Sequence, residues 1–400
     1  MNLNRRLRLH TTARATALLL TPLAALAQQG GGDGVTLYGR VDMYVGQETE
    51  NDGASNGSES KVANSGGLSG SRLGVRGSEV IADGWRARFA LEQGINLDNG
   101  TLGQGGRAWG RQSTIGVSGP FGSLDLGRRE SAYYDFRNGF VAIITTAAFD
   151  PVGAVFGETN PGNVSTSGGV RTSGTSGSTS ISNTAIDGSS ASAPGDYTSR
   201  YDNYVHYESP RFGPAQLAVG VVVPEDRRIV AGTQGSGTSA VSATLNLRGE
   251  KWRVSLAMQS EKYRTSITTA GVAQGRAEKT VTALGLGYDF GVVRVAAFVN
   301  QDEFVAVNGT KDKATEWAAG VTVPLGLWSV DAMIAEGRIK GVENKASGLG
   351  LVVRYALSKR TDVYVGHRSN RDDNIPTTGT TVRSARVKDS LTGLGIRHRF

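Results

Sequence analysis

Arginine is the residue type whose spacing in this chain points most clearly to a chemical task. Arg72 and Arg76 alternate with apolar residues, and so do Arg86 and Arg88 in the next segment. In an extended strand, arginines spaced in this way share one face and the apolar residues share the other. A guanidinium stays protonated at physiological pH and donates five N–H groups. The spacing therefore predicts a surface that concentrates anions.

Residues suited to catalysis are few in this sequence. His206, His367 and His398 belong to different expected strands, and no nucleophile motif accompanies them. A Ser-His-Asp site stays open as an alternative. The chain has no cysteine, and it carries no phosphate loop, dinucleotide fingerprint or metal-ligand spacing. We therefore predict no enzyme activity, no cofactor and no metal.

The elements that position the arginines are strands of about ten residues with alternating apolar and polar side chains. We expect sixteen of them, near 34–46, 71–81, 85–96, 111–119, 122–130, 200–209, 215–224, 238–249, 251–262, 279–290, 292–302, 313–324, 327–338, 346–358, 361–370 and 388–400. Seven short turns alternate with eight long polar loops between these strands, so short turns lie at one end and long loops at the other. Outer-membrane barrels show this asymmetry.

A strand with apolar side chains on one face and arginine on the other fits lipid on one side and water on the other. An arginine that faced acyl chains at the midplane would cost about 2–4 kcal/mol. Closure removes the unpaired edges that lipid cannot solvate. The sequence therefore predicts an all-β fold, a 16-stranded antiparallel transmembrane β-barrel around an aqueous channel. Parity points several arginines into that channel: Arg40, Arg72, Arg76, Arg86, Arg88, Arg200, Arg294 and Arg354.

The segment 131–199 is the longest of the expected loops. Its first part, Tyr133 to Pro151, contains aromatic side chains that favour burial. Its second part, near 157–195, is mostly Ser, Thr, Gly and Asn and cannot bury much. We expect the first part to fold into the lumen and narrow it, and the second to lie outside. A wholly external loop is the alternative.

The N-terminal segment resembles an export signal. Basic residues precede a short apolar run, and Ala25-Leu26-Ala27 matches a cleavage site. We expect residues 1–27 to be removed and 28–400 to form a single barrel domain. Losing the four signal arginines lowers the net charge from +7 to +3, so we expect no nucleic-acid partner.

Five segments resemble the Gram-negative general porins in order and spacing. They are Val35–Arg40, Ser71–Glu79, Arg111–Val117 with Phe121–Arg128, Tyr204–Pro210 and Gly393–Phe400. The resemblance implies a homotrimer in the outer membrane, in contact with lipid and lipopolysaccharide. It also implies a third loop that folds inward, and a final Phe400 that the assembly machinery reads. Phe400 alone would equally suit the last strand of a soluble sandwich.

The family also places a basic cluster on the wall, opposite acidic groups of the third loop. The resemblance transfers this cluster to Arg40, Arg72, Arg128 and Arg111, although strict alternation would point Arg128 at lipid. With the parity residues, the candidate pore-lining cluster is Arg40, Arg72, Arg76, Arg88, Arg111, Arg128 and Arg200. The third loop lacks the family's usual tip motif, so the acidic candidates are Asp135, Asp150 and Glu158 in no fixed order.

These observations predict an outer-membrane porin for passive diffusion of ions and small hydrophilic solutes, with a preference for anions. A substrate-specific channel, for instance for carboxylates, is the alternative within the class. A barrel enzyme or an adhesin is the alternative outside it. The transported solute and the pore radius are left open by the sequence.

Overall fold

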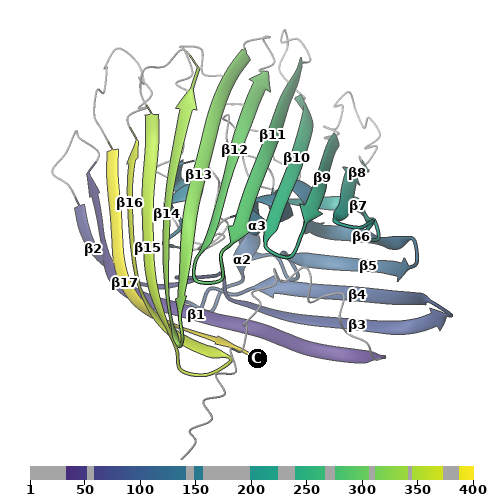
Figure 1. Ribbon diagram of the computed structural model, residues 1–400, viewed down its shortest axis with the longest axis horizontal. Helices are drawn as coiled ribbons and strands as arrows, with labels where there is room; N and C mark the ends of the chain where they lie inside the picture. Colours follow the sequence, from purple (N-terminus) through teal and green to yellow (C-terminus); the bar gives the residue numbers. More distant parts are fainter. Residues whose placement is uncertain are drawn as a thin grey trace, which may run out of the picture. The chain divides into compact units, whose positions relative to one another are not determined.

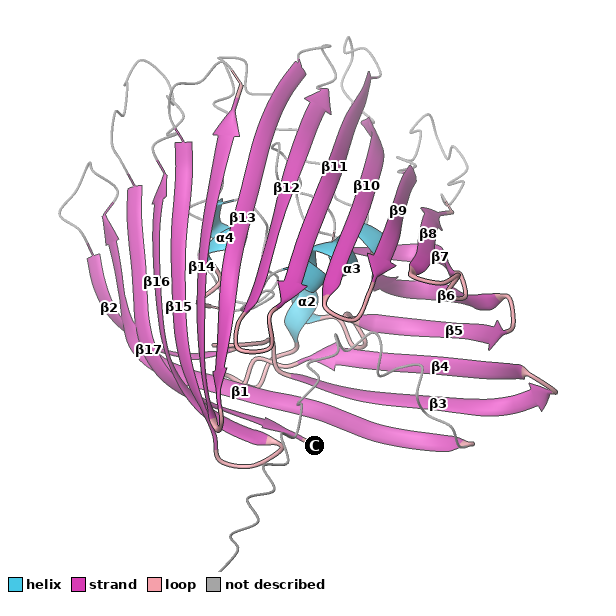
Figure 2. Cartoon of the chain, viewed as in Figure 1, coloured by secondary structure: helices cyan, strands magenta, loops and turns pink. Residues whose placement is uncertain are grey.

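The computed structural model describes residues 33–51, 58–140, 148–155, 199–223, 239–265, 275–305, 311–340, 345–372 and 387–400. These residues are almost entirely strands, with three short helices (Figure 2). No helix among them is long and apolar enough to cross a membrane. The all-β class predicted by the alternating pattern is confirmed.

The strands follow one another along the chain. Their bounds are β1 Gly34–Asn51, β2 Ser58–Ser65, β3 Arg72–Ala82, β4 Trp85–Gly94, β5 Gln112–Gly119, β6 Gly122–Glu130, β7 Arg200–Glu208, β8 Ala215–Val222, β9 Ser239–Arg248, β10 Trp252–Thr265, β11 Gly275–Asp289, β12 Arg294–Val305, β13 Lys311–Leu325, β14 Trp328–Ile339, β15 Lys345–Ala356, β16 Thr361–Asp372 and β17 Val387–Arg399. The helices are α2 Gly103–Gly106, α3 Ala132–Phe140 and α4 Pro151–Val155.

Sequential antiparallel pairing closes the sheet into a barrel (Figure 1). Each strand from β3 to β17 pairs with the next, and β17 pairs with β1. Strand β1 pairs with β2 along Met43–Glu50 and with β3 along Gly34–Arg40. Since β2 and β3 lie against successive parts of β1, they fill one position of the wall. The described strands therefore form the predicted sixteen-position barrel.

The break between β2 and β3 is organised by one buried carboxylate. Asp42 accepts hydrogen bonds from the backbone N–H groups of Leu68 and Ser69, at 3.0 and 2.9 Å. The hydroxyl of Tyr364 also donates to Asp42, at 2.5 Å. A buried carboxylate requires such partners. Asp42 thereby fixes the turn that redirects the chain from β2 into β3.

The seam between the first and last strands is closed at Phe400. The backbone N–H of Phe400 donates to the Gly39 carbonyl at 3.2 Å, and that of Gly39 donates back at 3.1 Å. The Phe400 ring lies so close to Gly39 that a Cβ at Gly39 would collide with it. Glycine at position 39 thus leaves room for the terminal ring.

Along β12, side chains alternate between the two faces of the wall. On β12, Val295 and Val299 are exposed, whereas Ala296, Phe298 and Asn300 are buried. Large exposed side chains such as Leu286 and Leu394 lie on the outer face, as a lipid-facing wall requires. Polar and charged residues lie on the other face, as parity predicted.

Two helices of segment 131–199 pack against the face of the sheet that carries the polar residues. α3 contacts β9 to β12, and α4 contacts β14 to β16. The rings of Phe136 and Phe298 meet edge to face, 6.2 Å apart, and the Tyr133 N–H donates to Ser242 at 2.8 Å. Figure 2 shows α3 and α4, in cyan, behind the front strands of the wall.

Two parts of this fold differ from the prediction. The expected loop 47–70 contains strand β2, which alternation missed because Ser58–Ser65 is polar on both faces. The helices α3 and α4 were not predicted either, because each is too short to show a sustained helical period. Both are short elements that form through tertiary packing rather than through local propensity.

Candidate functional site: charges on the inner wall

Three arginines lie in a row across neighbouring strands on the inner face. Arg40 on β1 is the direct register partner of Arg72 on β3 and of Arg399 on β17. Like charges directly opposite each other destabilise a sheet. In the described part of the chain, no ion pair joins Arg40 to a carboxylate. Such an arrangement holds positive charge at the wall that an anion can offset.

A longer network continues this row toward β7. Glu92 on β4 accepts from Arg111 Nε at 2.6 Å and lies 3.5 Å from Arg72. Glu130, at the end of β6, lies 3.8 Å from Arg111 and pairs with Arg200. The network joins three arginines and two glutamates, and little of their side-chain surface is exposed. Its net charge is positive, and the glutamates hold the guanidiniums in fixed places.

A second network lies on the inner face of β4 and β6. Arg88 binds Asp125 through two hydrogen bonds of 2.9 and 2.7 Å. Arg129 binds the same Asp125 at 2.8 Å and reaches Asp135 of α3 at 3.2 Å. This chain of contacts connects the wall directly to the helix in segment 131–199.

Arg128 does not belong to either network. Its guanidinium binds Asp202 at 2.7 Å and the Gly110 carbonyl at 2.7 Å. Here the pairing of β6 with β7 shifts, so that two residues of β7, Asp202 and Asn203, oppose Arg128. A bulge of this kind re-aims the neighbouring side chains. Parity from Asp125 correctly points to Arg129 as the inward residue, and the sequence reasoning passed over it.

Arg76 is the remaining member of the candidate pore-lining cluster, and its contacts differ from those of the other members. Its guanidinium lies 5.0 Å from the ring centre of Tyr38, over the ring face. A cation–π contact leaves the positive charge uncompensated by an anion. Arg76 therefore lies on the same wall but outside the glutamate network.

The three acidic candidates of the loop have different positions. Asp135 is the one that meets a wall arginine, Arg129. Asp150 is buried, caps α4 by accepting from the Val152 N–H at 2.9 Å, and lies 3.7 Å from Arg137 of α3. It therefore holds two parts of the loop together. Glu158 lies outside the described residues.

Asp135 is the titratable group of the described loop residues with a strongly shifted pKa. Burial raises its pKa to about 8, and the carboxylates of Glu130 and Glu208 add to this shift. Arg129 opposes the shift without cancelling it. The Asp135 carboxyl is therefore mostly protonated at neutral pH and titrates within the physiological range.

Carboxylates that the sequence reasoning did not select contact these arginines from the wall itself. They are Glu92, Asp125, Glu130 and Asp362, the last of which lies 3.3 Å from Arg399 of the row. Parity could have found Glu92, because it shares a face with Arg86 and Arg88. The resemblance drew attention to loop acids instead.

The other half of the wall carries buried carboxylates on its inner face. Glu261, Asp302, Glu316 and Asp331 all have less than 5% of their surface exposed. They lie on β10 and β12 to β14, whereas the arginine rows lie on β17, β1 and β3 to β7. Cations accompany these carboxylates: Arg354 of β15 binds Asp331 at 2.7 Å, and Lys279 of β11 is also buried. Charges of both signs therefore line the inner face of both halves. Charged side chains in this arrangement can attract ions and hold them near the wall.

Comparison with known proteins places these features in a family. A family model described as Gram-negative porin matches residues 15–375. The chain is similar to an outer membrane porin protein of Bordetella pertussis, with 28% identity over 96% of this chain and 98% of that protein.

Two solved structures share the fold. An anion-selective porin from Comamonas acidovorans matches with a TM-score of 0.70 and 22% identity, over 92% of this chain and all of that one. The OmpT protein of Vibrio cholerae, in a trimer form, matches with a TM-score of 0.59 and 13% identity, over 92% of this chain and all of that one.

Proposed function

The chain belongs to the Gram-negative porin family, and on that premise we propose that its channel prefers anions. As a member of this family, the protein is an outer-membrane porin with a water-filled channel for passive diffusion. The observation that carries the proposal is the row Arg72–Arg40–Arg399 on the inner face. The Comamonas acidovorans porin of similar fold is described as anion-selective, which supports the same preference here.

Reconstitution in a planar bilayer tests the preference. With a tenfold KCl gradient across the membrane, the zero-current potential is expected to have the sign of chloride permeation. Its magnitude should grow as the ionic strength falls, because the Debye length increases from about 8 Å at 0.15 M salt to about 30 Å at 0.01 M. A potential of the opposite sign contradicts the proposal. Arg360→Gln, in an exposed turn, is the matched control and should leave the potential unchanged.

We also propose that α3 narrows the channel. Three observations support this role: α3 packs on β9 to β12, its Asp135 contacts Arg129, and its aromatic side chains are buried against the wall. Because the chain has no cysteine, a single Asp135→Cys variant can be modified specifically. A bulky charged thiol reagent should then lower single-channel conductance. The same reagent on Lys359→Cys, in a short turn, should have little effect, and equal responses would exclude the proposal.

We propose a diffusion channel rather than an enzyme. His367 and His398 bond to the hydroxyls of Thr392 and Thr361, and His206 is buried beside Tyr204. These contacts support structural roles for all three. A substrate-specific channel predicts block of ion current by a particular carboxylate at low concentration, whereas a general pore keeps a linear current.

The assembly and processing proposals follow from the same family. We propose a homotrimer, the state described for one form of the Vibrio cholerae protein, in contact with lipopolysaccharide. Light scattering measures the molar mass of the detergent-solubilised protein before and after heating. We expect the mass of three chains before heating and of one chain after it. We further propose that residues 1–27 are removed on export and that segment 131–199 serves as the constriction loop. N-terminal sequencing of the exported protein should then begin at Gln28.

A further inference from the structure

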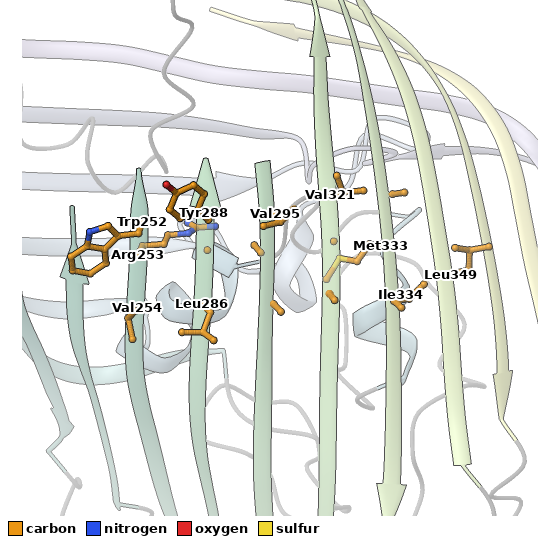
Figure 3. Close-up of a pocket in the computed structure, with 16 residues that line it drawn as sticks. Trp252, Arg253, Val254, Leu286, Tyr288, Val295, Val321, Met333, Ile334 and Leu349 are labelled. Carbon is orange, nitrogen blue, oxygen red and sulfur yellow. The ribbon is translucent and has the colours of Figure 1, made fainter. Parts of the chain in front are cut away.

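The outer face of strands β10 to β15 carries an apolar hollow that the transport function does not use (Figure 3). Its volume is about 700 Å³, within the range of ~300–1,000 Å³ that is usual for small-molecule sites. The labelled side chains of Trp252 and Val254 come from β10, that of Leu286 from β11 and that of Leu349 from β15. The hollow therefore lies in the lipid-facing wall.

The register of the strands explains how the hollow forms. Leu286, Ala297, Ala319, Ile334 and Leu349 are successive cross-strand partners on β11 to β15. The two alanines at the centre are flanked by large side chains on both sides. Because neighbouring strands lie about 4.8 Å apart, the span from Leu286 to Ile334 is roughly 14 Å.

The rows above and below give the hollow its ends. The next row toward the long loops contains Val299 and Trp317, which stand higher than the two alanines. The next row toward the short turns contains Tyr288, Val295 and Val321. The hollow is therefore bounded along the strands as well as across them, and it differs from a featureless stretch of wall.

The surroundings of the hollow indicate its occupant. It is continuous with the apolar outer face, which contacts lipid hydrocarbon in the membrane. Trp252 and Tyr288 lie at its short-turn end, and aromatic side chains of this kind mark the membrane interface. Lys251, in the exposed turn beside Trp252, supplies a cation at the height where a lipid phosphate lies.

We propose that the hollow holds one acyl chain of a phospholipid, with the phosphate of that lipid beside Lys251. Burial from water contributes nothing to this preference, because bulk lipid is as apolar as the wall. The preference comes from close van der Waals contact along the alanine floor and from the charge at the rim. A flexible chain fits such a narrow depression, whereas the flat wall of a second barrel would leave it empty.

Native mass spectrometry of the detergent-purified trimer or monomer, after stepwise delipidation, tests the proposal. The wild type is expected to retain one phospholipid per chain longer than all others. Ala319→Phe fills the floor and should abolish this retention. Ala243→Phe makes the same change on the outer face of β9, outside the hollow, and should retain the lipid. Equal retention in all three proteins overturns the proposal, as does a retained lipopolysaccharide in place of the phospholipid.

A fluorescence measurement keeps the test independent of the folding of one variant. In two proteins every tryptophan except Trp252 or Trp328, both at the short-turn end, is replaced by Phe, so that position 317 keeps a large side chain. Each protein is placed in vesicles that contain a phospholipid brominated along its acyl chain. Trp252 should be quenched at least twofold more strongly than Trp328, and Ala297→Phe should remove the difference. Equal quenching of the two proteins contradicts the proposal. A disulfide between two copies of the Ala319→Cys variant would contradict it as well, because a second copy would then cover the hollow. Ion selectivity is expected to be unchanged in every variant, so the two proposals fail separately.

Discussion

Arg40 and Arg72 lie directly opposite each other on β1 and β3, on the face of the wall that is hidden from lipid. Glu92 is shared between Arg72 and Arg111. Among the described residues, Arg40 is therefore the arginine of the row that forms no ion pair with a carboxylate. Keeping two cations in register costs stability, about 0.2–1 kcal/mol for such cross-strand pairs. A function that needs anions at this wall accounts for the cost.

Arg40→Gln should therefore separate function from stability. We expect the zero-current potential in a KCl gradient to move toward zero, because one cation leaves the row. The free energy of unfolding in urea should stay level or rise by up to about 1 kcal/mol. A variant that lost stability while keeping full anion preference would remove Arg40 from the selective part of the wall.

Glu92→Gln should change selectivity in the opposite direction. It removes a negative charge from the network and leaves Arg72 and Arg111 without their shared partner, so anion preference should increase. Breaking a buried ion pair lowers the free energy of unfolding by about 3–5 kcal/mol. Because water in the channel reaches this wall, we expect Glu92→Gln to lose about 3 kcal/mol or less. Bilayer recording and urea unfolding measure the two effects on the same preparation.

Asp135 predicts a pH dependence. Its pKa of about 8 means that it gains a negative charge as the pH rises from 7 to 9, so anion preference should fall over that range. Between about pH 4 and 8 the folded protein holds a proton that the unfolded chain has released, so stability falls as the pH rises through this window.

Asp135→Asn mimics the protonated form and provides the control. Its selectivity should match the wild type at pH 6 and stay constant to pH 9. A wild-type potential that is flat between pH 7 and 9 would falsify the role of this carboxyl. The charged groups that face Asp135 are Arg129, Glu130 and Glu208.

Tyr364→Phe tests the hydrogen bonds of Asp42 that hold the turn between β2 and β3. The variant loses the hydroxyl that donates to Asp42 and leaves that buried carboxylate with its backbone donors. Removing a hydrogen bond to a buried charged group costs about 1.5–3 kcal/mol. Thermal unfolding should show this loss, while Tyr355→Phe, on the outer aromatic girdle, should not.

Phe400→Ser tests the closing residue. The ring covers Gly39 at the seam of β1 and β17. We propose that the assembly machinery also reads this final Phe. The amount of protein in the outer membrane should fall severalfold, while channels that do assemble keep wild-type selectivity. Normal insertion of this variant would refute the assembly role.

The sequence by itself determined the barrel, because period-two alternation acts within each strand and needs no distant contact. β2 and β3 share one position of the wall, and the sequence predicted a strand at that position. The prediction came from β3, because apolar and polar residues alternate along Arg72–Ala82. Alternation also placed Arg40 and Arg72 on the inner face, because parity depends on neighbouring residues alone.

Only the tertiary structure decided which charges meet. Register across strands sets Arg40 against Arg72, and the bulge in β7 brings Asp202 opposite Arg128, which binds it. The short helix α3 forms because Phe136 and Phe140 pack on a wall built from strands more than a hundred residues away. Pairings of this kind depend on contacts between distant segments, which no local pattern records.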